Sequence, residues 1–322
     1  MSFPKTNRPR DVKVLDGWIR DLAEKDQAAA NSIRRGLSYV VVAAALAQLR
    51  EDDGSPLFVL KGEVAMQLRF GSRARLSRDY DAVFRRRIIE HLENVLALTP
   101  TCPVGDFRVR ALGKPDPLGP TGAWRQTLKI SYAGKAWGEV YLEVSEPEGH
   151  SIEIGNLEHL ELLPDPTVFG LDEIAPVPVM PVAYQMAQKL HACTEEREDR
   201  ENERFTDLLD LQLLAELVEV NGWAAVREAC VETFTIRRKH SWPPRVRAFV
   251  GWSQGYSRAA IENGFPITDV MEAVAAVASI AAQEARHFGL RRWSSSLDPL
   301  ILGDGIRDLR SCLAAPGQRR GD

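Results

Sequence analysis

The chain has 322 residues, of which 44% are hydrophobic and 27% charged, and its formal net charge is −4. These values are those of an ordinary globular protein long enough for two domains. They exclude a polycation, so a nucleic-acid partner would need a local basic patch.

Cysteine usage and apolar runs indicate the compartment. The four cysteines are scattered, without a C-x-x-C pair, which argues against a zinc site or a disulfide framework and favours a reducing cytoplasm. Residues 1–10 contain no signal-peptide core, and the longest apolar run, 39–49, is too short to span a bilayer. We therefore expect a cytoplasmic protein without a membrane partner.

Helical and strand-like patterns alternate in the first half of the sequence. Residues 11–50 have a helical pattern with a break near Asn31-Ser32, a good helix cap. Next we expect a strand, a helix, a strand, a helix and three strands, at residues 57–60, 62–70, 76–84, 85–98, 107–112, 124–132 and 139–145. Residues 113–122 are rich in Gly and Pro, which predicts a loop.

The second half is almost wholly helical. The Pro-rich segment 176–181 is typical of a stiff connector. Helices are expected at residues 181–197, 203–220, 222–238, 268–286 and 298–314. The sequence predicts an α+β protein: a mixed-sheet domain over residues 1–175 that includes the amino-terminal helices, then an all-helical domain over residues 176–322.

Asp79 and Asp81 are two residues apart in a predicted strand. Such residues point to the same face, here together with Ser77. Two adjacent carboxylates repel each other unless a cation lies between them, which predicts a divalent metal site. Taken alone, the pair is also typical of a solvated strand. Ser77 either bonds within its turn or is a control point, where an added phosphate would crowd the pair with negative charge.

Gly62 stands between the predicted strand and helix that precede this pair. A glycine there lets backbone N–H groups and a helix N-terminus approach a phosphate. The segments Lys61-Gly-Glu-Val-Ala-Met66, 71–75 and Ser77-Arg-Asp-Tyr-Asp81 together resemble the AbiEii/AbiGii family of nucleotidyltransferase toxins. The later segments 185–192 and 204–211 are similar to the lysine helix and the Asp-x-x-Asp helix of that family.

The resemblance implies a nucleotidyltransferase fold and a toxin of a toxin–antitoxin or phage-defence pair. Such a toxin transfers NMP from an NTP, with Mg²⁺ or Mn²⁺, to an acceptor hydroxyl. The implied acceptor is the 3′ end of tRNA, where added nucleotides block translation. A cognate antitoxin is a further implied partner, and no DNA partner is expected. By this resemblance Asp79 and Asp81 hold the metal, and the nucleotide is bound by Lys61, Gly62, Ser77, Lys189, Asp207 and Asp210.

The sequence departs from the family pattern at Glu63, where the family has a second glycine. A carboxylate beside a triphosphate turn would repel the ligand unless it points away or helps to bind metal. Two other functions stay open, of which the second is suggested by Glu63. One is nucleotidylation of a protein or small molecule, and the other is a non-catalytic module that binds a nucleotide or a partner.

Glu143 is a candidate third carboxylate. Val140, Leu142 and Val144 form one apolar face of a predicted strand, which leaves Glu143 on the other face. There it could be a metal ligand or the general base for the attacking hydroxyl. The alternative is a solvent-exposed strand face.

Lys189 lies at the edge of a helical apolar stripe, from which it could reach a phosphate, or it is an ordinary surface lysine. Asp207 and Asp210 share one helical face and either orient Lys189, contact the nucleotide or solvate their helix. His191 is expected to belong to the packing or to the boundary of its helix.

Basic residues cluster at 69–78, 85–87 and 237–240, and Trp242, Trp252 and Tyr256 follow the last cluster. Such clusters could follow an RNA backbone, with aromatic rings for base stacking. The alternative is a set of solvated helix ends.

Overall fold

The computed structural model describes residues 8–26, 29–75, 79–86, 88–119, 122–153, 155, 157–160, 162, 164–172, 174–197, 200–218 and 222–286. The chain forms two compact units, Met1–Gln185 and Met186–Asp322. Ser77, Arg78, Cys312 and the predicted helix 298–314 lie outside the described residues.

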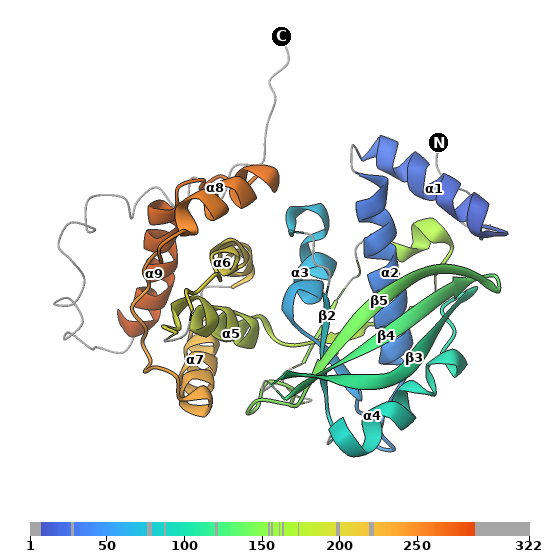
Figure 1. Cartoon of the computed structure of the whole chain (residues 1–322), viewed down its shortest axis with the longest axis horizontal. Coiled ribbons are helices and arrows are strands. Elements are labelled where there is room, and N and C mark those ends of the chain that lie inside the picture. The colour runs from blue at the N-terminus through green and yellow to red at the C-terminus, as the bar shows by residue number, and fades with distance from the viewer. Residues whose placement is uncertain are drawn as a thin grey trace, which may run out of the picture. The chain divides into compact units, whose positions relative to one another are not determined.

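A seven-stranded mixed sheet with the order β3-β4-β5-β2-β1-β7-β6 forms the centre of the first unit (Figure 1). Its strands are β1 (Phe58–Leu60), β2 (Asp79–Phe84), β3 (Phe107–Leu118), β4 (Ala123–Tyr132), β5 (Lys135–Ser145), β6 (Glu158–Leu160) and β7 (Val177–Val179). Strands β3, β4 and β5 form an antiparallel meander. Strand β2 runs parallel to β5 and antiparallel to β1, and β1 runs parallel to β7.

The helices of the first unit are α1 (Val12–Lys25), α2 (Ala30–Ala47), α3 (Gly62–Phe70) and α4 (Ile88–Leu96). Helix α5 (Val182–Thr194) contains the division between the units. It is followed by α6 (Thr206–Leu217), α7 (Trp223–Arg237), α8 (Trp252–Glu262) and α9 (Val270–Arg286). The predicted α+β class, a mixed sheet followed by helices, is confirmed.

The core of the first unit lies against one face of the sheet, where α2 packs (Figure 1). The apolar run of α2 is buried throughout, as an apolar helix in a core must be. Alternation in β2 adds Tyr80, Ala82 and Phe84 to this core. The Tyr80 ring packs edge-on against Tyr39 of α2, with ring centroids 5.4 Å apart. This burial turns the residues on either side of Tyr80 to the opposite face of the sheet.

The prediction of a stiff connector at residues 176–181 is wrong, because the centre of this segment forms strand β7. Val177 and Val179 are buried, and Val179 is in register with Leu60 of β1. The Met180 N–H donates to the Leu60 carbonyl at 2.8 Å. A strand this short tolerates the missing N–H of Pro178, since two buried valines supply its packing. The predicted domain boundary at residue 175 stays a prediction; the compact units divide within α5.

The loop predicted at residues 113–122 is also largely wrong, because β3 continues to Leu118. The register shifts between Leu112 and Asp116, and Gly113 has a φ of +71° there. Strand β3 is an edge strand, so Gly and Pro interrupt few ladder bonds and are accommodated as an irregularity. The break expected near Asn31 lies slightly earlier, since α2 begins at Ala30.

Helix α8 was not predicted, because Gly255 and two serines weaken its helical pattern. Gly255 is needed for packing: a Cβ there would lie 2.8 Å from the ring of Phe205. Trp252 and Tyr256 of α8 are fully buried. Among the described helices, none is long and apolar enough to cross a membrane.

Candidate active site

Three carboxylates lie on the sheet face opposite α2. In the parallel pairing of β2 with β5, Asp81 is in register with Glu143, and Asp79 with Tyr141. The buried pair on the other face is Tyr80 with Leu142. Strand alternation therefore brings Asp79, Asp81 and Glu143 to one side. Of the two orientations considered for Glu143, the register favours the one beside the aspartate pair.

Gly62 begins α3 directly against Asp81. Its φ is +60°, and a Cβ on it would lie 2.7 Å from Asp81 Cγ. A side chain at this position would therefore be strained and would collide with the carboxylate. The Lys61 N–H donates to the Asp81 carbonyl at 3.1 Å, and the Glu63 N–H donates to Asp81 Oδ2 at 3.4 Å. The glycine thus allows the N-terminus of α3 to lie on the Asp81 side chain.

Asp81 is held in an electrostatically unfavourable position. Burial raises the pKa of its carboxyl to about 6, opposed by the charge of Lys61 and reinforced by Glu63 and Glu143. The Lys61 ammonium itself donates to Ser145 Oγ at 2.6 Å. A half-buried carboxylate with further acids around it is an environment that a bound cation would stabilise.

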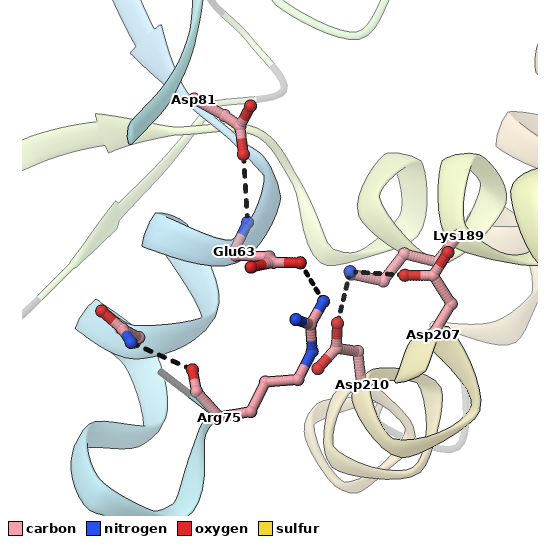
Figure 2. A network of polar contacts seen from close by, with 7 residues as sticks. Glu63, Arg75, Asp81, Lys189, Asp207 and Asp210 are labelled. Carbon is pink, nitrogen blue, oxygen red and sulfur yellow. Dashed lines mark hydrogen bonds and ion pairs between the residues drawn. The ribbon is translucent and has the colours of Figure 1, made fainter. Parts of the chain in front are cut away.

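Glu63, the departure from the family pattern, has a local partner. Its carboxylate forms an ion pair with Arg75, whose carbonyl accepts from Gln67 Nε2 at 3.0 Å. Figure 2 shows the Glu63 side chain turned to Arg75 while its backbone N–H faces Asp81. Within the first unit, the acidic charge that the sequence places beside the glycine turn is therefore compensated by arginine.

Arg125 of β4 is a member of this site that sequence reasoning missed. It is in register with Glu143 across the β4–β5 pair. Its guanidinium forms an ion pair with Glu143 and lies 3.4 Å from Asp79 Oδ1. The alternation of β4 places Arg125 on the face of Thr127 and Lys129, but only the strand register reveals that this face carries the acids.

The donors fit a hard divalent cation by chemistry, because Asp79, Asp81 and Glu143 all offer carboxylate oxygens. Their side chains are not gathered around one point. In the part of the chain that the structure describes, no three His, Cys, Asp or Glu side chains are arranged to hold a metal. Arg125 contacts two of the acids, and the third faces α3.

Lys189 of α5 lies between two aspartates of α6. Its ammonium is 3.1 Å from Asp207 Oδ1 and 2.5 Å from Asp210 Oδ2 (Figure 2). The three side chains are 10%, 2% and 1% exposed. These contacts contradict both the surface-lysine alternative for Lys189 and the solvated-helix alternative for the aspartates. The spacing Asp-x-x-Asp puts both acids on the helical face that meets α5.

Two arginines of the basic clusters are bonded within the first unit, and an RNA surface at these clusters stays a prediction. Arg69 is buried and bonds Glu158 and the Met180 carbonyl, while Arg85 bonds the carbonyls of Pro56 and Ile152. Trp252 and Tyr256 are buried and unavailable for base stacking. The two arginines and the two aromatic residues therefore stabilise the fold. The N–H groups of the arginines donate to acceptors inside the protein.

His191 packs as expected. It is buried, its ring centroid is 4.8 Å from that of Phe234, and a second ring, His240, lies at 4.6 Å. Burial, followed by the charges of Arg237, His240 and Lys239, lowers the pKa of His191 to about 3. The ring is therefore neutral at physiological pH.

Comparisons with known proteins give the family. The family described as nucleotidyl transferase AbiEii toxin, type IV toxin–antitoxin system, matches residues 44–304. Among solved structures, the chain is similar to MenT4, a nucleotidyltransferase toxin from Mycobacterium tuberculosis H37Rv. The identity is 16% and the TM-score 0.44, with 79% of this chain and 94% of MenT4 covered. No curated protein matches the sequence. The family match spans most of the chain and includes both sequence blocks that carry the resemblance, so the chain belongs to the AbiEii family of nucleotidyl transferase toxins.

Proposed function

We propose that this toxin transfers NMP from an NTP to the 3′ end of tRNA in an Mg²⁺-dependent reaction, and thereby blocks translation. The observation that carries the reaction type is the placement of Asp79, Asp81 and Glu143 on one sheet face, with Asp81 at the N-terminus of α3. The family gives the toxin role and implies a cognate antitoxin. The family resemblance supports the tRNA acceptor, and the cysteine usage supports a cytoplasmic location.

In this proposal Asp79 and Asp81 hold the metal, Mg²⁺ or Mn²⁺. The cation would supply charge neutralisation at the reacting phosphate. Glu143 either completes the ligand set or accepts the proton of the attacking hydroxyl. Its register beside Asp81 supports both roles.

Phosphate binding is assigned to the glycine turn and to two lysines. Gly62 lets backbone N–H groups of α3 approach an anion, and Lys61 lies beside the same turn. Ser77, outside the described residues, stays a predicted nucleotide contact. Lys189 is proposed as a compact positive charge for a phosphate, with Asp207 and Asp210 orienting its ammonium.

The test is to incubate purified protein with total tRNA, Mg²⁺ and each α-³²P-labelled NTP in turn. We expect label in RNA and release of pyrophosphate, and loss of both in Asp79→Asn. The matched control is Glu139→Gln, which removes an exposed carboxylate from the same sheet face. Label in protein instead of RNA would show that the acceptor is a protein and not tRNA. Transfer to no acceptor would favour a non-catalytic module that binds a nucleotide.

A further inference from the structure

Arg125 occupies the space between two of the candidate metal ligands. Its Nε donates to Glu143 Oε1 at 3.1 Å, a terminal guanidinium nitrogen pairs with the same oxygen, and that nitrogen lies 3.4 Å from Asp79 Oδ1. We propose that Arg125 is an internal counter-ion that a divalent cation must displace before the site can work. The inference rests on the proposed function and adds a residue that controls access of the cation.

The competition follows from shared oxygen atoms. Asp79 Oδ1 and Glu143 Oε1 are the kind of oxygen that Mg²⁺ and Mn²⁺ bind, and Arg125 donates to both. A guanidinium and a divalent cation at the same carboxylates would repel each other strongly at such short range. Binding of the cation therefore competes with the Arg125 pair at these two carboxylates.

Arg125 can leave only as a cation. The guanidinium of Arg125 stays protonated at physiological pH with or without its carboxylate partners. Its side chain is 42% exposed and that of Asp79 48% exposed, so water can receive the released group. Exposed ion pairs of this kind are weak, which makes displacement by a divalent cation feasible.

Asp81 does not take part in this pairing. Its carboxylate faces the Glu63 N–H, so it stays in place whether or not Arg125 is bound. The cation therefore meets one preset acid and two acids that must be released. This arrangement predicts weaker cation binding in the absence of nucleotide than three adjacent carboxylates would give.

The same two strands provide a matched control. Lys129 of β4 pairs with Glu139 of β5 on the same sheet face. These two residues lie directly opposite each other, as Arg125 and Glu143 do. Both pairs join a basic residue of β4 to an acid of β5, and both are partly exposed. Only the Arg125 pair includes candidate metal ligands.

The experiment measures Mn²⁺ affinity of the full chain without nucleotide, by the electron paramagnetic resonance signal of free Mn²⁺. We expect Arg125→Gln to bind Mn²⁺ about tenfold more tightly than the wild type. Lys129→Gln should bind like the wild type. Unchanged or weaker Mn²⁺ binding by folded Arg125→Gln would overturn the proposal.

A second measurement is made on protein that keeps Arg125. It therefore tests the proposal even if Arg125→Gln folds poorly. In protein with ¹⁵N-labelled arginine, the Arg125 Nε–Hε resonance is assigned by its absence from Arg125→Lys. Saturating Mg²⁺ should shift this resonance, whereas an unmoved resonance in Mg²⁺-bound protein would contradict displacement.

Asp81→Asn separates the inference from the function on which it rests. Loss of Mn²⁺ binding in Asp81→Asn with no change in Arg125→Gln would reject only the role of Arg125. Wild-type Mn²⁺ binding by Asp81→Asn would reject the metal site itself, and the Arg125 inference with it.

Discussion

The chain builds two clusters of the same charge composition, one basic residue between two acids, in opposite environments. In the first unit, Arg125 joins Asp79 and Glu143 on a partly exposed sheet face. In the second unit, Lys189, Asp207 and Asp210 are almost completely buried between two helices. An exposed pair is weak and can rearrange, whereas breaking a buried pair leaves an uncompensated charge. The first cluster is therefore suited to exchanging its cation, and the second to holding its lysine in one position.

The largest expected effect is on the buried cluster. Lys189→Met keeps the side-chain length but leaves Asp207 and Asp210 without their ammonium, which should destabilise the protein by about 3–5 kcal/mol. Lys129→Met, which breaks an exposed pair with Glu139, should leave the stability almost unchanged. Urea unfolding measures both. Equal small losses would show that the buried cluster has no special stabilising role.

The same Lys189 variant tests phosphate binding where it remains folded. If Lys189 contacts a phosphate, the variant should lose NTP affinity in calorimetric titrations. Unchanged affinity and turnover would restrict Lys189 to a structural role.

In contrast to Lys189→Met, which should lose stability, Asp79→Asn should lose activity and keep its stability. We expect transfer activity to fall by on the order of a hundred- to a thousandfold or more, because electrostatic stabilisation at the reacting phosphate is lost. The free energy of unfolding should change by less than about 1 kcal/mol, since the Asp79 side chain is half exposed. Radiolabel transfer and urea unfolding are measured on the same preparation, with Glu139→Gln alongside. Loss of stability in place of activity would erase the contrast between the clusters.

Gly62→Ala combines backbone strain with a collision. The positive φ should cost about 1–2 kcal/mol, and contact of the new methyl group with Asp81 should add about 1–3 kcal/mol. Gly54→Ala is the control, because Gly54 has a φ of +81° and an added Cβ there would meet no atom within 4 Å. We expect thermal denaturation to show a larger loss for Gly62→Ala, together with lost transfer. Equal losses would mean that the close approach to Asp81 is unimportant.

His191 gives the smallest effect, a pH dependence of stability. Its pKa is about 3 when folded and near 6.5 when unfolded, so unfolding takes up a proton below pH 6.5. The contribution to stability is full above pH 6.5 and declines as the pH falls. Between pH 7.5 and 5.5 the loss should be about 1 kcal/mol.

His191→Phe should remove this part of the acid sensitivity, while His150→Gln should not, because His150 is exposed. Urea unfolding at several pH values measures the difference. Parallel pH profiles for His191→Phe and the wild type would contradict the effect.

Much of the fold could be predicted from local patterns. The helix after Gly62, the strands around Asp79 and Glu143 and the later helices all follow from apolar periodicity and glycine placement. The errors lie where local and tertiary signals conflict. Three prolines make residues 176–181 resemble a connector, but two buried valines make residues 177–179 a strand. Gly255 obscured α8, although the glycine is required by the nearby Phe205 ring.

The sequence by itself determined which residue types are present and which strand face carries Asp79 and Asp81, because side-chain alternation is a local property. It also determined the family, through two motif blocks. Only the tertiary structure decided which charged side chains contact one another in each cluster. The pairing of β2, β5 and β4 brings Glu143 and Arg125 to the aspartates, and the packing of α5 on α6 buries Lys189 between two acids. Strand register and helix packing join residues far apart in the chain, so the charge balance of each cluster exists only in the folded protein.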